Sequence, residues 1–459
     1  MSRSFRDPAG QVEDDGRRIL RVVHAAARAA TQELLASDLY AGLVRDGLLI
    51  EACDVRPSAE GGLEIEHPRV DIPSYPFEWT PAMLADAALL TLDVQTRAWS
   101  AGWTLKDAPA NNVLFLGSRP VLCDLLSLQK RQPGDAPGWQ AYGQFVRHFV
   151  LPLLAISQHG RSPRDIFLAH RDGLRAAEVA PFVPWYTHLG LAMWLHVRLP
   201  ARLERRRIVS NTAKTGQDRP HTGRPAADGT PWLIGNLRGF VQRLGHSSPA
   251  VSTWSAYTDN RDHYAEAELS AKRAAVQALV DRLMPRRVLD VGANSGEFSR
   301  LAARAGAQVL ALDDDINALD ALHRSLRGQA NTVQCVHANF ARPTPATGWQ
   351  LAETRSLPER LAGRFDLVLM LAVIHHLAVT ERVPLAQLFE SLASCCTGTL
   401  LLEFVPRDDP RFVEIAGANA RLYEGWSRQA LLDAAAPLFS LQGETAISSH
   451  RTLLQLQRR

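Results

Sequence analysis

The 459-residue sequence contains little of several features that would assign it to a class at once. Its five cysteines form no Cys-x-x-Cys pair and no metal-binding spacing, which predicts a reduced setting and no zinc site. Lysine is scarce, at four residues, and the formal net charge is only +3. This weak charge argues against a protein that binds long stretches of nucleic acid.

Long hydrophobic runs are also absent. The longest apolar stretches, residues 149–156 and 190–197, are too short to cross a bilayer, and residues 1–12 lack the apolar stretch of a signal peptide. We therefore expect a soluble, cytoplasmic protein without a membrane span. The composition is that of a globular chain, and the length suggests roughly two or three domains. The oligomeric state cannot be read from the sequence.

The clearest change in composition lies between residues 202 and 232. The basic run Arg205-Arg206-Arg207 is followed by a polar stretch without apolar periodicity. We interpret the basic run as the solvated end of a helix, with contact to RNA or an acidic surface as the alternative. The division predicted is a mainly helical N-terminal domain over 1–204, an exposed basic and polar linker over 205–245, and an α/β domain over 246–459.

The C-terminal part alternates between apolar, β-rich runs and helical patterns. The runs predict strands at residues 287–291, 308–312, 332–337, 365–371, 399–404, 439–445 and 451–456. Continuous apolar strands that alternate with helices are typical of a largely parallel sheet, here Rossmann-like and seven-stranded, with helices on both faces. Ligands of such sheets bind at the carboxyl ends of the strands.

A glycine-rich turn joins the first of these strands to its helix. Gly292 lets the backbone pass close to a ligand, and Gly296 lets the helix start tightly. A dinucleotide fingerprint would need glycines where the sequence has Asn294 and Glu297, so binding of NAD is not predicted. The acid at Asp290 suits instead a ligand with an ammonium or sulfonium group.

A second acid, Asp313, ends the next strand. There it could accept hydrogen bonds from both hydroxyls of a ribose, or it could cap the following helix, for which Asp315 is better placed. Acids at both Asp290 and Asp313, beside one glycine-rich turn, favour a ligand site over either local explanation.

On these residues, the segment 285–404 resembles a class I S-adenosylmethionine-dependent methyltransferase. The resemblance rests on Asp290-Val-Gly-Ala-Asn-Ser-Gly296, Leu312-Asp313, Phe365-Asp366 and Ile374-His-His376. It implies S-adenosyl-L-methionine as the cofactor. The methionine part would lie on the loop that contains Gly292, Asn294 and Gly296, and the ribose would lie on Asp313. Asn339, followed by Phe340, would contact the adenine amine through its carbonyl oxygen.

The whole C-terminal half is similar to two-domain bacterial methyltransferases of the nodulation type. The similarity implies that helices carrying Trp254, Tyr257, Tyr264 and Lys272 cap the cofactor pocket; Trp254 and Tyr257 could equally be core residues.

Transfer of a methyl group to oxygen or nitrogen needs a positioned acceptor and removal of a proton. His375 and His376, after the fourth strand, are candidate general bases, or they line the pocket; Glu403, at the end of the fifth strand, is a further candidate. The Asn/Asp-Pro-Pro-aromatic signature of nucleic-acid amino methyltransferases is absent from 371–377, and no metal site is predicted.

Residues 80–130 contain a second pattern. Asp107, Asn112 and Asp124 resemble the catalytic and metal-binding loops of protein-kinase-like and aminoglycoside-phosphotransferase folds, which implies an acid beside a hydroxyl and magnesium on Asn112 and Asp124. No lysine precedes Lys106, and residues 1–75 show no glycine-rich phosphate loop. We therefore expect a degenerate lobe that binds substrate or a partner, with an active kinase or a plain turn as alternatives.

Together, these patterns predict S-adenosylmethionine-dependent methyl transfer to a small-molecule, glycan or peptide acceptor. Two alternatives stay open: an ATP-dependent phosphotransferase that uses Asp107, Asn112 and Asp124, and a scaffold that binds the cofactor without turnover.

Overall fold

The computed structural model describes residues 2–4, 6–135, 138–183, 190–210, 228–246, 266–329, 331–448 and 450–459. The chain divides into two compact units, residues 1–115 with 119–250, and residues 116–118 with 251–459. Trp254, Tyr257 and Tyr264, expected to cap the cofactor pocket, lie outside the described residues.

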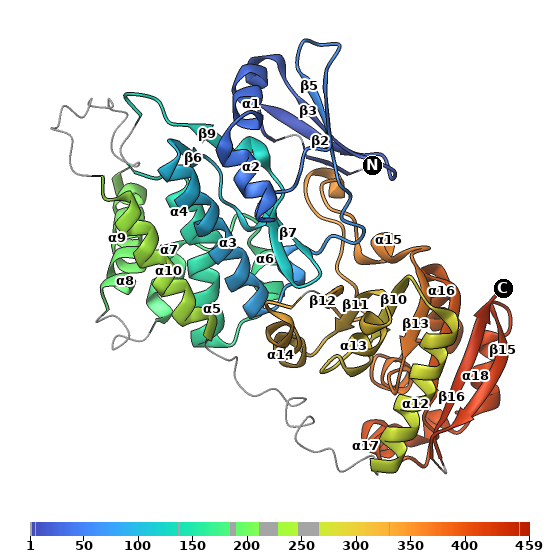
Figure 1. Ribbon diagram of the computed structural model, residues 1–459. Helices are drawn as coiled ribbons and strands as arrows, with labels where there is room; N and C mark the ends of the chain where they lie inside the picture. The colour runs from blue at the N-terminus through green and yellow to red at the C-terminus, as the bar shows by residue number, and fades with distance from the viewer. Residues whose placement is uncertain are drawn as a thin grey trace. The chain divides into compact units, whose positions relative to one another are not determined.

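The first unit begins with a five-stranded antiparallel sheet in the order β1-β2-β3-β5-β4 (Figure 1). Its strands are β1 Ser2–Ser4, β2 Gly10–Asp14, β3 Ile19–Val23, β4 Asp54–Pro57 and β5 Leu63–His67. The expectation of a mainly helical domain missed this sheet, because its strands are short, of three to five residues, and every residue of β4 is exposed. Strand β5 alternates along its whole length, with Leu63, Ile65 and His67 turned inward.

Helices make up most of the rest of this unit, with two small two-stranded sheets between them. The helices are α1 Arg28–Leu35, α2 Asp38–Arg45, α3 Pro81–Ser100, α4 Tyr142–Phe145, α5 Leu151–His159, α6 Pro163–Ala169, α7 Ala176–Val179, α8 Leu191–Met193, α9 Leu199–Ser210 and α10 Thr230–His246. The short strands are β6 Trp103–Leu105, paired with β9 Leu128–Lys130, and β7 Val113–Leu116, paired with β8 Arg119–Leu122. The longest helix, α3, is buried along most of its length because Thr80 caps its start and apolar residues occupy more than one of its faces.

Helices occupy both ends of the segment 205–245, for which the sequence predicts a linker. Helix α9 continues to Ser210, and α10 begins at Thr230 and packs against α3. Ile234, Leu237, Val241 and Leu244 are buried on α10 at helical spacing, an apolar face that the polar surroundings concealed. Residues 211–227, the centre of the predicted linker, lie outside the described residues.

The second unit contains the seven-stranded sheet expected from the sequence, in the order β12-β11-β10-β13-β14-β16-β15. Its strands are β10 Arg287–Val291, β11 Gln308–Asp313, β12 Val333–His337, β13 Phe365–Met370, β14 Cys396–Phe404, β15 Phe439–Ala446 and β16 Thr452–Arg458. The first five are mutually parallel, whereas β16 pairs antiparallel with both β14 and β15. The strand order reverses beside β10, the point at which such sheets bind ligands.

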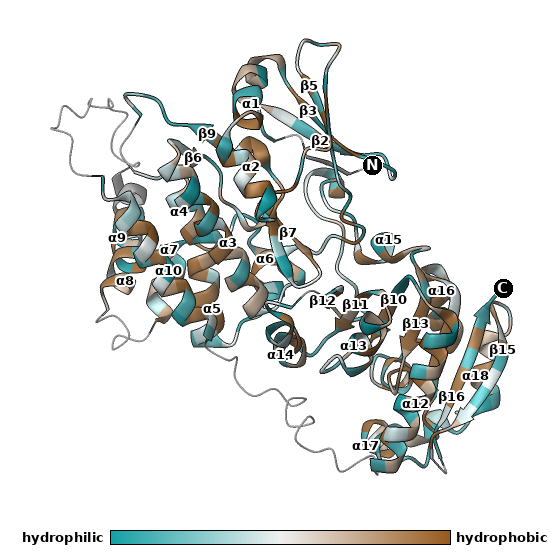
Figure 2. Cartoon of the chain, in the orientation of Figure 1, coloured by the Kyte–Doolittle hydropathy of each residue, from teal (hydrophilic) through white to brown (hydrophobic). Residues whose placement is uncertain are grey.

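Helices alternate with these strands, as predicted. They are α12 Glu266–Leu283, α13 Glu297–Arg304, α14 Ile316–Leu326, α15 Leu357–Leu361, α16 Leu385–Cys395, α17 Pro410–Ala416 and α18 Arg428–Ala435. The central strands β10 and β13 are buried and predominantly hydrophobic (Figure 2). No helix within the described ranges combines the length and the hydropathy that a bilayer span requires.

Candidate functional site

The turn between β10 and α13 adopts a backbone that glycine favours. Gly292 has φ +73°, and a Cβ atom there would overlap the side chain of Val373 in the loop after β13. Gly296 has φ +71° and precedes α13, where a Cβ would overlap Leu322. The two predicted glycines therefore bring the turn against the neighbouring loop and helix, and Asn294 between them also has a positive φ, of 48°.

Asp290 lies on β10 immediately before this turn. Its side chain is 2% exposed and accepts a hydrogen bond of 2.6 Å from the hydroxyl of Ser299. Burial raises the pKa of Asp290 to about 6, and the nearby charge of Asp313 adds to the increase. Ser299, on α13, is a partner that sequence reasoning missed.

Asp313 is the last residue of β11, next to β10 in the sheet. One carboxylate oxygen accepts from the backbone N–H of Asn294 and the other from that of Asp315, each at 2.7 Å. Desolvation nevertheless raises the pKa of Asp313 to about 6. The cap of α14 is Asp315, which accepts from the N–H groups of Asn317 and Ala318, so Asp313 is not the helix cap. The structure thus brings the two predicted acids together at adjacent strand ends.

Asn339 follows β12, and both ends of its amide are engaged. The oxygen accepts from the N–H groups of Ala341 and Arg342, at 2.8 and 3.1 Å. The nitrogen donates to Asp314 and to Glu381, both at 3.0 Å. The carbonyl oxygen expected to meet an adenine amine is therefore already used to hold a turn. Phe340, beside it, is partly exposed. Glu381 was not predicted from the sequence.

The two candidate histidines lie in the helical segment after β13, which continues as a π-helix over His376–Thr380. His375 is 2% exposed, its ring centroid lies 4.3 Å from that of His376, and it stacks on Phe412 of α17. Burial holds the pKa of His375 well below its usual value and also lowers that of His376, so both rings are neutral near pH 7. The Nδ1 atom of His375 has no hydrogen-bond partner in the described part of the chain.

Glu403, on β14, is fully buried within a network of ion pairs. Its carboxylate pairs with Lys272 of α12 at 2.6 Å and with Arg451 at 3.2 Å. Arg451 in turn pairs with Asp409 at 2.7 Å, and Asp409 caps α17. The network therefore links α12 to α17, the helix whose Phe412 contacts His375.

Lys272 contacts both the residues after the glycine-rich turn and the ion-pair network around Glu403. Its ammonium lies 5.2 Å from the ring centroid of Phe298, two residues beyond the glycine-rich turn, and its charge opposes the increase in the pKa of Asp290. The side chain is 5% exposed. The sequence placed Lys272 on a capping helix, but its pairing with Glu403 joins residues 131 positions apart and has no local signal.

The glycine-rich turn, the two acids and the loop after β13 lie at one edge of the sheet, where the parallel strands end. Residues 261–442 match a sequence family described as a methyltransferase domain. This match confirms that the C-terminal part contains a methyltransferase domain, as expected from the sequence. It does not extend to residues 80–130, where the kinase-like resemblance stays a prediction.

Among solved structures, magnesium protoporphyrin IX methyltransferase (ChlM) from Synechocystis PCC 6803, crystallised with bound S-adenosylmethionine, is similar at 18% identity. The similarity covers 45% of this chain and 92% of that chain, with a TM-score of 0.32. The N-methyltransferase NodS from Bradyrhizobium japonicum WM9 is 10% identical over 42% of this chain and 97% of its own, with a TM-score of 0.30.

A match over the whole length comes from a curated protein. The nodulation protein NoeA of Rhizobium meliloti (strain 1021) is 30% identical over 467 residues, which cover 99% of this chain and 95% of that protein. The chain therefore belongs to the family of the nodulation protein NoeA and carries a methyltransferase domain in its C-terminal part.

Proposed function

We propose that the C-terminal unit transfers a methyl group from S-adenosyl-L-methionine to an oxygen or nitrogen of a small-molecule, glycan or peptide acceptor. In this proposal the N-terminal unit binds the substrate or a partner. The observation that carries the proposal is the pair of carboxylates, Asp290 and Asp313, at the ends of adjacent strands beside one glycine-rich turn.

The charge of this edge suits a cationic donor. Burial raises the pKa values of both acids to about 6, because desolvation disfavours their charged forms. A ligand with a positive group next to Asp290 would stabilise the ionised form. The residues therefore fit S-adenosylmethionine, with Asp290 near the sulfonium end and Asp313 at the ribose.

The bound cofactor supplies a methyl group on a sulfonium, so its leaving group needs no further activation. The protein then has to orient the acceptor and take up its proton. We assign proton uptake to His375, because its ring is neutral near pH 7 and its Nδ1 atom is buried without a protein partner in the described part of the chain. His376, the adjacent ring, would line the acceptor side.

Two predicted site residues receive different roles. Glu403 is held between two cations, so we assign it to positioning α12 and α17 and not to proton transfer. Asn339 would shape the adenine side by fixing Asp314 and Glu381, and the partly exposed ring of Phe340 would meet the base.

The proposal is tested by growing cells on methyl-labelled methionine and comparing their labelled metabolites. Four strains are needed, carrying the wild-type gene, no gene, Asp290→Asn, or Asp281→Asn as a matched control on the exposed face of α12. We expect a labelled product in the wild-type and Asp281→Asn strains that is absent from the other two. The same set of labelled products with and without the gene would contradict methyl transfer.

A further inference from the structure

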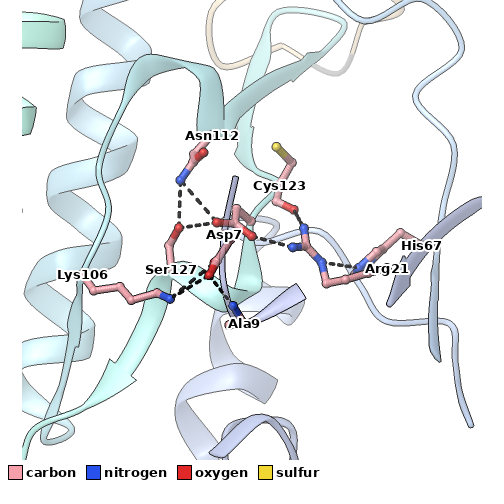
Figure 3. A network of polar contacts seen from close by, with 9 residues as sticks. Asp7, Ala9, Arg21, His67, Lys106, Asn112, Cys123 and Ser127 are labelled. Carbon is pink, nitrogen blue, oxygen red and sulfur yellow. Dashed lines mark hydrogen bonds and ion pairs between the residues drawn. The ribbon is translucent and has the colours of Figure 1, made fainter. Parts of the chain in front are cut away.

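A polar network in the first unit joins the N-terminal sheet to the loops around β7 and β8 (Figure 3). It contains two of the three residues singled out by the second sequence pattern, Asn112 and Asp124. The amide nitrogen of Asn112 lies 3.5 Å from the carboxylate of Asp124, and Ser127 donates a hydrogen bond to the same oxygen. Burial raises the pKa of Asp107, and the charges of Asp124 and Asp7 add to the increase. The hydrogen bonds place the amide of Asn112 and the hydroxyl of Ser127 beside the carboxylate of Asp124.

Arg21, on β3, is the member of this network that sequence reasoning missed. Its side chain is 6% exposed, and its guanidinium donates to Asp124 Oδ1 at 2.6 Å, to the carbonyl of Cys123 at 3.0 Å and to His67 Nε2 at 3.3 Å. The other ring nitrogen of His67 lies 2.8 Å from the carbonyl of Glu51. Burial and Arg21 lower the pKa of His67 to about 4, so the ring is neutral and accepts from Arg21.

The guanidinium is therefore held on three sides, in contact with the acid that the resemblance would place on magnesium. Carboxylate and amide oxygens are the ligands that magnesium and manganese prefer. Here one oxygen of Asp124 faces Arg21 and the other accepts from Ser127 and Asn112, whose amide presents its nitrogen. A dication at this point would be repelled by Arg21. Within the described ranges, no group of three or more His, Cys, Asp or Glu side chains is placed to hold a metal ion.

The remaining ion pair of the network, between Lys106 and Asp7, does not involve Asp124. Lys106 pairs with Asp7 at 3.3 Å, and Asp7 also accepts from the N–H of Ala9, which fixes the loop between β1 and β2. Lys106 is thus engaged with the sheet and Arg21 with Asp124, so each of the two cations already has an acid of its own. The residues do not fit a bound divalent metal.

We propose that Arg21 is a resident cation that replaces a divalent metal on Asp124, and that it masks a cation site on this carboxylate. The first unit then performs no metal-dependent phosphoryl transfer. Removal of the guanidinium opens the site to Mg²⁺ or Mn²⁺. This proposal is independent of the methyltransferase site, because all of its residues belong to the first unit.

The test is a titration of the full chain with Mn²⁺. Binding is measured from the electron paramagnetic resonance signal of the Mn²⁺ that stays free. We expect Arg21→Met to gain one site with an affinity at least about tenfold above any binding by the wild type, because a positive charge beside the dication is removed. Adding Asp124→Asn to this variant should abolish the gain. Arg69→Met is the matched control, since Arg69 pairs with Asp14 at 2.7 Å in the same unit, and no gain is expected from it.

Two results would overturn the proposal. One is that the wild type binds Mn²⁺ and that Asp124→Asn abolishes this binding. This result does not depend on a folded Arg21 variant. The other is an Arg21→Met protein that is folded by circular dichroism and gains no Mn²⁺ site.

Discussion

Replacement of Asp290 by Asn should stabilise the protein at neutral pH and at the same time remove its affinity for the methyl donor. A carboxyl group with an ordinary pKa of 3.8 has a pKa of about 6 in the folded chain, because burial disfavours its charge. The difference of about 2 pKa units, at about 1.4 kcal/mol per unit, means that ionised Asp290 lowers the free energy of unfolding by about 3 kcal/mol well above pH 6.

The sign of this effect gives its pH dependence. Since the pKa of Asp290 is raised in the folded state, the folded protein binds the proton more tightly than the unfolded chain. The loss of unfolding free energy caused by ionised Asp290 is therefore complete above pH 6. It falls to about half near pH 5 and is small at pH 4. An amide at this position does not ionise and carries no such penalty, so the stability advantage of Asp290→Asn should shrink by the same amounts on acidification.

The assay is urea unfolding of the wild type and Asp290→Asn at several pH values between 8 and 4.5. The altered contact with Ser299 costs a similar amount at each pH, so the pH-dependent part of the difference isolates the charge. A difference that stays constant across this range, or that grows as the pH falls, would refute the reasoning. An acid retained only for folding would instead cost stability when it is removed.

Three further predictions follow from contacts in the second unit. Affinity for S-adenosylmethionine, measured by calorimetry, should fall as the pH is lowered through about 6, because both strand-end carboxylates are then protonated; an affinity independent of pH would contradict this. Gly292→Ala should destabilise the fold by about 1–3 kcal/mol through overlap with Val373, whereas Gly306→Ala, with a similar positive φ but open space, should cost less in thermal unfolding. Equal losses of stability in the two variants would show that the positive φ alone causes the destabilisation, without the overlap with Val373. Lys272→Met should cost about 3–5 kcal/mol in urea unfolding by leaving the charge of Glu403 partly uncompensated, and adding Glu403→Gln should recover part of the loss; a fully additive double variant would exclude the coupling.

The sequence predicted the second unit well because its signals are local. The strands β10, β11 and β13 are apolar runs, and β10 begins and ends where the pattern placed it. The roles of Gly292 and Asp315 also follow from local rules, a close approach of the backbone and a helix cap. Local pattern therefore fixes both the elements and the glycine-rich turn.

The features that sequence reasoning missed depend on distant partners. Arg21 is one arginine among many until β3 and the loop after β8 bring it against Asp124, 103 positions away. Glu403 reads as a free acid at a strand end, because nothing nearby in the sequence shows the two cations on either side of it. The N-terminal sheet was missed because β4 has no apolar face that a pattern could detect.

The central claim, that Asp290 and Asp313 together bind the methyl donor, is tested most directly by isothermal titration of S-adenosylmethionine into the full chain. The wild type and Asp281→Asn should bind with the same affinity, and Asp290→Asn and Asp313→Asn should each bind at least about tenfold more weakly, since each loses a charge or a hydrogen-bond acceptor for the ligand. Unchanged affinity in both variants, with both proteins folded, would contradict the account.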